Sequence, residues 1–538
     1  MELEQISPPK GENAPRAVTT KPQAANAEES QVVQLSTWKF FTVLVSLCSA
    51  GFLAGYDSTC VGTLAPMISD EFHSLSDVSW YGIAYSLSSC ATTLSFGKLY
   101  SFYPTNIVVV TALATFVSGS VICATAPSST AFIIGRAVAG VGNAGIFSGC
   151  NIIFTRITPL RWRPFYQSLI GSVECIALAT APLIAGAIAE YSSWRVCFYA
   201  SVPLGAIPII TISFFLRLPK TDQQSSTAGL AKLRQLDLVG MALFVPLMVC
   251  FVLALQCGGT QYPWNSKQVI VLLTMTGVLL AAFVAQQAYM KNKAMVPARL
   301  LRSRIFLFSV LVSFATSGAL YVFTFYLPIY YQAIRDVSTV QSGVRDLSRI
   351  LGLVIAIIAA GAMTTITGYY MPPMLCGGIL MTIGAGLTTT FNETTSLAQI
   401  IGYQALFGLG CGLAFQQPYA AVQATTAAAD TNAAIVVLPF AQFLGSVVVL
   451  AICQNVFSIE FIDGLAAKVP GLDPDIVLDS GALNLKKVIP TEYLAQALEV
   501  YNDALVHVFY IGLGVACATT LGALGSGWRS VKHADKNK

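Results

Sequence analysis

Three charged side chains stand inside long apolar stretches of this sequence. Asp57 lies in "CSAGFLAGYDSTCVGTLAP", Arg136 begins at the second letter of "GRAVAGVGNAGIFSG", and Glu174 lies in "GSVECIALATAPLIAGAIAE". A charge in hydrocarbon is costly, so such residues generally mark sites for protons, ions or charged ligands. A carboxylate can take up a proton, whereas an arginine keeps its charge and needs a partner or water. We therefore expect proton or cation chemistry inside an apolar bundle.

Each of the three residues also has a simpler interpretation. Asp57 could reach the outer headgroup region, Arg136 could extend outward from the first turns of its helix, and Glu174 could find water near the cytosolic end. For Asp57 and Arg136 we favour a cavity-lining role, with the two coupled. Desolvation would favour the protonated form of Asp57, which suits a proton carrier. For Glu174 the two interpretations are evenly balanced.

The composition requires a membrane protein. Hydrophobic residues make up 55% of the 538 residues and charged residues only 10%, against roughly 25% charged in soluble domains. The apolar stretches have helix length, which predicts an all-α bundle rather than a barrel. The net charge of +4 is too small to indicate a nucleic-acid partner, and the 13 Cys and 3 His lack metal-ligand spacing. We expect no metal and no cofactor.

We predict fourteen transmembrane helices. Their expected limits are 39–63, 79–100, 106–126, 130–155, 166–190, 194–216, 237–257, 268–290, 306–332, 347–366, 371–391, 398–427, 431–457 and 505–528. Arginines and lysines gather in alternate loops, which places both termini in the cytosol by the positive-inside rule.

The basic loops also divide the chain. We expect a disordered N-terminal tail at 1–37, a six-helix bundle at 38–217, two additional spans at 218–304, a second six-helix bundle at 305–528 with an extracellular loop at 458–504, and a cytosolic tail at 529–538. Residues 1–37 contain no short apolar region typical of a cleavable signal. Two bundles around a central cavity are typical of a transporter, because they can rock about a site at mid-membrane.

Further residues are predicted from small or polar side chains within spans. Gly140 and Gly142 follow Arg136 and would allow close helix approach, while Pro182 and Gly186 interrupt a row of alanines and indicate a bend. The amides Gln416, Gln417, Gln423 and Gln442 could line a substrate cavity or simply bond between helices. Tyr326, in "TFYLPIYYQ", fits an interfacial aromatic belt, with an outer gate as the alternative. Asn392 begins a glycosylation sequon close to a span.

Motifs of energy-coupled or catalytic proteins are missing. The sequence contains neither GxxxxGK[ST] nor HExxH, and no GxSxG with a suitable histidine. An enzyme is therefore disfavoured, and an ion gradient or the solute itself should supply the energy.

Several stretches together resemble the major facilitator superfamily, and more narrowly the fourteen-span drug:proton antiporters of fungi. They are "YDSTCVGTLAPMISDEFHSLSDVSWYGIAYSL", "GRAVAGVGNAGIFSG", "APLIAGAIAEYSSWRVCFYASVPLGA", "YYQAIRDVSTVQSGVR" and "QQPYAAVQ". The resemblance runs from about residue 38 to 528. It implies a plasma-membrane efflux pump that exports small amphipathic compounds, such as toxins, other secondary metabolites or drugs, in exchange for protons. We expect a monomer.

The resemblance assigns roles residue by residue. Asp57 matches the acid of the first span, Arg136 the arginine of the fourth, and Pro182 with Gly186 the bend of the antiporter motif. The sequence departs from the family in "GKLYSFYPTN", which lacks the usual acid and arginine cluster of a charged latch, and at Glu174, where the family is usually uncharged. Importers of a nutrient, facilitative carriers and vacuolar transporters share this fold and remain alternatives.

Overall fold

The computed structural model is built from α-helices. It describes residues 33–531 apart from 34, 75–76, 217, 219–236, 260–261, 291–293, 393 and 470–492. In these residues thirteen helices are long and apolar enough to cross a membrane, and α3 (Val78–Phe102) is a further helix of membrane length that is richer in Ser and Thr. The prediction of an all-α membrane protein with fourteen spans is confirmed. Most of the predicted tails, 1–32 and 532–538, lies outside the described residues.

The first half of the chain forms six spans, the last of which is broken at Ala200. The helices are α2 (Thr37–Phe72), α3 (Val78–Phe102), α4 (Thr105–Thr125), α5 (Ser129–Ile157), α6 (Arg163–Tyr191), and α7 (Trp194–Tyr199) continued by α8 (Ser201–Phe215). Two more spans and a short connecting helix follow: α11 (Leu238–Cys257), α12 (Lys267–Met290) and α13 (Ala298–Leu301).

The last part of the chain again forms six spans, two of which are interrupted. They are α14 (Arg304–Ile329) with its π-helical end η3 (Tyr330–Ile334), α15 (Thr339–Thr367), α16 (Met371–Thr388), α17 (Leu397–Phe415) with α18 (Gln417–Thr425), α19 (Ala428–Lys468), and α22 (Leu494–Gly525).

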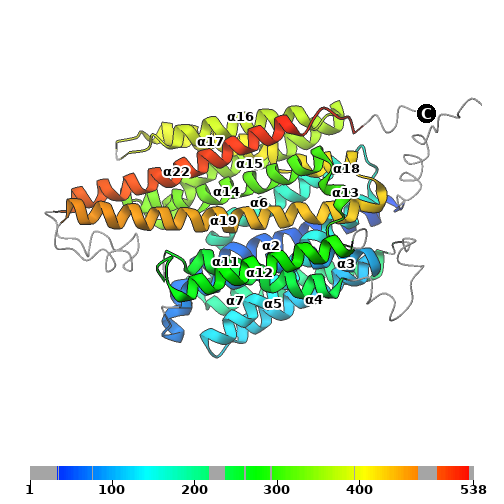
Figure 1. Cartoon of the computed structure of the whole chain (residues 1–538), viewed down its shortest axis with the longest axis horizontal. Helices are drawn as coiled ribbons and strands as arrows, with labels where there is room; N and C mark the ends of the chain where they lie inside the picture. Colours follow the sequence, from blue (N-terminus) through cyan, green and yellow to red (C-terminus); the bar gives the residue numbers. More distant parts are fainter. Residues whose placement is uncertain are drawn as a thin grey trace, which may run out of the picture.

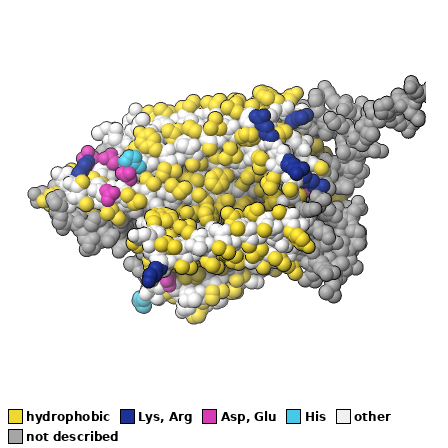
Figure 2. Space-filling model, in the orientation of Figure 1, with side chains coloured by type: hydrophobic (Ala, Val, Ile, Leu, Met, Phe, Trp, Pro, Cys, Tyr) yellow, Lys and Arg dark blue, Asp and Glu magenta, His cyan; other side chains and the backbone are white. Residues whose placement is uncertain are grey.

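The long helices run side by side, with α3, α4 and α5 toward one side and α16, α17 and α22 toward the other (Figure 1). The halves meet where α6 packs against α15 and α3 packs against α19. Hydrophobic side chains cover the middle of the face in Figure 2, and described charged residues lie toward its two ends. A hydrocarbon layer around this middle would leave those charges in water.

Two predicted outer loops are partly helical. Helix α2 continues to Phe72, through part of the first expected loop, and Glu71 there accepts hydrogen bonds from Trp194 Nε1 at 2.6 Å and Arg195 Nη2 at 2.7 Å. The loop expected at 458–504 is shortened from both sides, because α19 ends at Lys468 and α22 begins at Leu494. Polar contacts join the two extended helices: Lys468 Nζ lies 3.1 Å from Glu499 Oε1, and His507 Nδ1 lies 3.2 Å from Glu460 Oε2. The central residues of that loop, 470–492, lie outside the described residues.

Glycines set how closely the helices approach. A Cβ atom on Gly142 would lie 2.4 Å from the backbone nitrogen of Phe116 in α4, and one on Gly140 would lie 2.1 Å from Ser88 Oγ in α3. Neither position accepts even a methyl group without movement of a neighbour. The row Gly140–Gly142 therefore holds α5 tightly between α3 and α4.

The two halves pack unequally along the membrane axis. We call the end that carries Arg156, Arg299 and Arg304 the basic end. Near this end a Cβ on Gly361 of α15 would lie 2.3 Å from Ser168 Oγ of α6, whereas toward the other end a Cβ on Gly343 would lie 3.8 Å from Leu183. Along the α6–α15 contact the halves are therefore closed more tightly at the basic end.

Candidate functional site: two buried carboxylates

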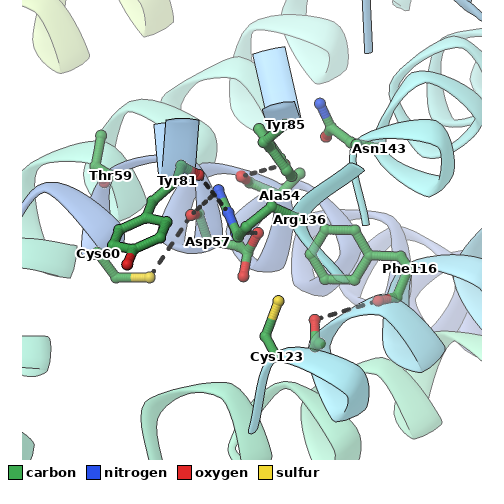
Figure 3. Close-up of polar contacts among 12 residues, drawn as sticks. Ala54, Asp57, Thr59, Cys60, Tyr81, Tyr85, Phe116, Cys123, Arg136 and Asn143 are labelled. Carbon is green, nitrogen blue, oxygen red and sulfur yellow. Dashed lines mark hydrogen bonds and ion pairs between the residues drawn. The ribbon is translucent and has the colours of Figure 1, made fainter. Parts of the chain in front are cut away.

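Asp57 and Arg136 form a buried ion pair. Arg136 Nη1 donates to Asp57 Oδ2 at 2.5 Å, and each side chain is 1% exposed. Arg136 Nη2 also donates to the backbone oxygen of Asp57 at 3.2 Å. The pair joins α2 to α5, helices that are separated by two others in the sequence (Figure 3).

Helix α3 completes the environment of Arg136. Arg136 Nε donates to the backbone oxygen of Tyr81 at 3.0 Å, and the guanidinium lies 4.4 Å from the ring centre of Tyr85. The Tyr85 hydroxyl in turn donates to Ala54 of α2 at 3.3 Å. A cation on an aromatic face is stabilised, most of all where water is excluded. The arginine therefore holds three helices together.

One carboxylate oxygen of Asp57 is not used in the ion pair. Asp57 Oδ1 is buried and has no hydrogen-bond partner among the described residues. A buried acceptor without a partner costs about 1–3 kcal/mol and needs an explanation. A proton on this carboxyl group would remove its charge and weaken its bond to Arg136.

Glu174 has a different environment. It is half-buried on α6, and its carboxylate makes no hydrogen bond or ion pair within the described chain. It lies in the wall of a cavity of about 20 Å³ between α2, α5, α6 and Gln416. This volume holds about one water molecule. Gly55 makes room for the acid, since a Cβ there would lie 2.8 Å from the Glu174 backbone oxygen and 3.5 Å from its Cγ.

A chain of amides links this cavity to the second half of the molecule. Gln423 Nε2 of α18 donates to Gln167 Oε1 of α6 at 3.0 Å, and Gln167 Nε2 donates to Asn151 Oδ1 of α5 at 2.7 Å. Gln167 and Asn151 line the cavity. The amide of Gln416 also faces α6, where a Cβ on Gly171 would lie 2.1 Å from its Nε2. Amides from both halves thus meet around one acid.

The residues that the sequence predicts to line a substrate cavity lie in different places in the structure. Glu174 and Gln416 line the cavity, and Gln423 contacts it through Gln167. Gln417 instead accepts a hydrogen bond from Thr364 at 2.8 Å. Asp57 and Arg136 are coupled as expected, because they form an ion pair, and neither lies in the wall of the Glu174 cavity. Their cavity-lining role stays a prediction.

Two other predicted cavity residues contact aromatic neighbours. Gln442 accepts a hydrogen bond from Tyr419 at 3.1 Å. Tyr326 is 7% exposed and packs against Phe457 with ring centres 6.1 Å apart. An interfacial belt is wrong for Tyr326, because its side chain is buried, although the neighbouring Phe325 is 50% exposed. The outer-gate interpretation stays a prediction.

Pro182 lies inside α6, where it leaves one backbone carbonyl oxygen without its usual donor. A proline lacks the N–H that would bond to the residue four positions earlier, here Leu178. Thr59 Oγ1 of α2 lies 3.4 Å from that oxygen and 3.2 Å from the oxygen of Gly55. Ala177, Ala181 and Ala185 are fully buried beside α2 side chains. A Cβ on Gly186, in contrast, would meet only Thr63 at 3.8 Å.

Sequence reasoning missed a charged cluster at the basic end. Lys98, in the stretch that lacks the family's usual acid, interacts electrostatically with Asp237 and Asp430. Asp430 lies in the first turn of α19 and also pairs with Arg299 of α13. Asp237 caps α11 by accepting from Gly240 N at 3.0 Å. The acids come from distant parts of the chain, so no local motif could have indicated them. The sequon residue Asn392 is exposed, and its Oδ1 accepts from Thr394 Oγ1 at 2.8 Å.

A larger surface hollow lies apart from this chemistry. It has a volume of about 380 Å³ and is lined mainly by apolar residues at the junction of α5 and α6, among them Ile157, Trp162 and Tyr166. None of its lining residues is charged. It therefore offers nothing with which to bind a proton or an ion.

Comparison with known proteins decides the family. The model of the Major Facilitator Superfamily matches residues 47–450, which include both carboxylates and the amide chain. The chain belongs to the major facilitator superfamily. This family consists of transporters, so the chain is a multi-pass membrane transporter rather than an enzyme.

Fungal members of the superfamily are similar over nearly the full length. The MFS-type efflux pump MFS1 of Trichophyton rubrum is 40% identical over 512 residues, which cover 95% of this chain and 96% of the relative. The efflux pump aflT of Aspergillus parasiticus is 38% identical over 500 residues, covering 93% and 97%. The matched regions are thus nearly complete on both sides.

Solved structures of superfamily members share the fold. The human organic anion transporter MFSD10 aligns with a TM-score of 0.55 at 13% identity, covering 88% of this chain and 99% of that one. The proton:xylose symporter XylE bound to 6-bromo-6-deoxy-D-glucose aligns with a TM-score of 0.58 at 12% identity, covering 93% and 99%. At these identities the similarity concerns the fold alone.

Proposed function

We propose that this protein exports small amphipathic organic compounds, such as a fungal secondary metabolite or a drug, in exchange for protons. Relatives that are about 40% identical over nearly the whole chain are efflux pumps, which supports the outward direction. Transport requires no nucleotide site, and an imposed proton gradient can supply the energy.

The observation that carries the proton part of this proposal is the closed Asp57–Arg136 pair with its unbonded Oδ1. Protonation of Asp57 would remove the charge that holds Arg136, and the contacts of α2 with α5 would weaken. Loss of the proton would restore the pair. One carboxyl group can therefore convert proton binding into a change of helix packing, which is what a coupled carrier needs.

The helix packing also suggests which parts of the protein move during transport. We expect the bundles 38–217 and 305–528 to rock about the Glu174 cavity, with the tight α6–α15 contact at the basic end separating when the carrier opens to that side. The two spans within 218–304 lie beside them, and Val269 is the one buried residue of α12. Pro182 and Gly186 would let α6 bend, while Gly140 and Gly142 would keep α5 in close contact with α3 and α4 as the bundle moves.

The charge bias of the loops supports the orientation of the chain, and the resemblance to efflux pumps supports the choice of membrane. We propose a plasma-membrane protein with both termini in the cytosol, and a fluorescent tag at the C-terminus would show whether it instead lies in the vacuolar membrane. Export by a monomer is the simplest form, since both halves of the cavity come from one chain.

The test is compound uptake into liposomes that contain the purified full-length protein. Acidic liposomes should accumulate an amphipathic compound while protons leave, and dissipating the gradient with a proton ionophore should stop both fluxes. The variant Asp57→Asn/Arg136→Gln keeps two polar groups but no charges at the pair, so it should fold and yet lose proton-driven uptake at least tenfold.

Two results would count against the proposal. Uptake that is unaffected by the ionophore would indicate a facilitative carrier. Uptake that is fully proton-driven in the double variant would place the coupling proton on another group.

A further inference from the structure

We propose that Glu174 and the amides around it form a recognition site for the protonated basic nitrogen of exported compounds. The inference rests on the proposed export function, and it assigns that function a chemical class of substrate: amphipathic amines. The carboxylate is the charged group in the cavity wall, and the other polar groups there are amides and a thiol.

Among the described residues around the cavity, Glu174 is an acid without a paired cation. On the helices packed against α6, Asp57 is paired with Arg136, and Arg349 is paired with Asp346 through hydrogen bonds of 2.8 and 2.6 Å. Glu174 has no such partner in the described chain. Burial without a partner opposes the charged form of Glu174. A bound cation would stabilise that charged form, and the attraction between the two charges is stronger in apolar surroundings than in water. An ammonium group would supply the missing positive charge.

The size and lining of the cavity fit an ammonium head. A volume of about 20 Å³ accommodates a group the size of water, which an –NH₃⁺ group is. Such a group has three donors, and the free acceptors here are the Glu174 carboxylate and Gln416 Oε1, which lacks a hydrogen-bond partner among the described residues. Phe147 contributes an aromatic ring to the wall. The apolar body of the compound would lie between the bundles when they separate.

The cavity also lies between the two halves of the chain, so a bound ligand can contact both. Gln416 comes from the break between α17 and α18, and Glu174 comes from α6. A cation between them would replace the present packing of the Gln416 amide against Gly171. Recognition at this point therefore differs from the Asp57–Arg136 pair, which is closed and involves only the first half.

The experiment compares two fluorescent amphiphiles that differ in one group. One ends in a primary ammonium, and the other ends in a hydroxyl at the same position. Equilibrium binding to the detergent-purified full-length protein is measured at pH 7 for the wild type, Glu174→Gln, Glu174→Asp and Glu190→Gln. The last is a matched control, because Glu190 is an exposed acid near the far end of the same helix.

We expect the wild type and Glu190→Gln to bind the ammonium compound at least tenfold more tightly than the hydroxyl compound. Glu174→Gln should remove this preference by weakening the ammonium compound alone, and Glu174→Asp should retain part of it. A wild type without preference, a preference that survives in Glu174→Gln, or an equal loss for both compounds would overturn the inference.

Failure of the proposed function is detected separately. Proton-driven uptake of the hydroxyl compound into liposomes should occur in the wild type and in Glu190→Gln. If the wild type binds both compounds but transports neither under a proton gradient, export by antiport is wrong, whatever the binding preference shows.

Discussion

Two carboxylates in the same bundle have opposite environments. Asp57 is 1% exposed, closed against Arg136, and held by three helices of the first half. Glu174 is half-buried, faces a cavity, and meets an amide from the second half. Sequence context alone made them look alike, since each is an acid within an apolar helix.

The difference suggests a division of labour. We propose that the closed pair, with its unbonded oxygen Asp57 Oδ1, is the group that responds to a proton. An open, unpaired carboxylate can accept any cation of suitable size, including one that belongs to the cargo. We therefore expect substitutions at Asp57 and at Glu174 to differ in kind, in both stability and transport.

The largest effect on stability should come from breaking the pair on the acid side. Asp57→Ala leaves the Arg136 guanidinium buried without a counter-charge, and arginine cannot lose its proton. We expect a loss of about 3–5 kcal/mol in the free energy of unfolding, measured by denaturant titration in detergent. Arg136→Met should cost less, because the remaining carboxyl group can take up a proton.

The combined variant Asp57→Ala/Arg136→Met should recover most of that loss, since neither charge remains. A double variant as unstable as Asp57→Ala would show that packing, not charge, dominates at this site.

The next largest loss of stability should follow substitution of Gly140, which lets α5 pack closely against α3. A Cβ from Gly140→Ala would lie 2.3 Å from the backbone oxygen of Tyr85, the residue whose ring supports Arg136. Overpacking of this kind costs about 1–3 kcal/mol. The melting temperature should fall clearly for Gly140→Ala and remain unchanged for Gly186→Ala, which has room. Equal melting temperatures would contradict the packing described for α5.

A smaller effect is expected where Thr59 covers the carbonyl that Pro182 leaves free. Thr59→Val keeps the shape but removes the donor, with an expected loss of about 1 kcal/mol. In a Pro182→Ala background the restored backbone N–H can bond Leu178, so the same threonine change should then cost less, with only the bond to the Gly55 oxygen left to lose. The double-variant cycle measures this coupling, and simple additivity would rule it out.

The smallest change in stability should follow Glu174→Gln. No partner is left behind, because the carboxylate has none in the described chain, so we expect the free energy of unfolding to stay within about 1 kcal/mol of wild type. A loss as large as that of Asp57→Ala would show that Glu174 is part of the structural core, and would end the comparison drawn above.

Some features of the fold and the site were predictable from the sequence, and others were not. The spans follow from apolar length, a property of each segment by itself, and Asp57 and Arg136 stood out because charges in such segments are rare. The extension of α2 to Phe72 depends on contacts with Arg195, far along the chain. The cluster of Lys98 with Asp237 and Asp430, and the cavity around Glu174, likewise arise from helix packing, which residue spacing within one helix does not determine.

The most direct test of the division of labour measures proton and compound fluxes together in liposomes, with an uncharged amphipathic compound. We predict that Glu174→Gln retains compound-dependent proton flux at the wild-type ratio of protons to compound, and that Asp57→Asn/Arg136→Gln loses it. The reverse result, with coupling lost in Glu174→Gln and kept in the double variant, would place the proton on Glu174 and contradict the account.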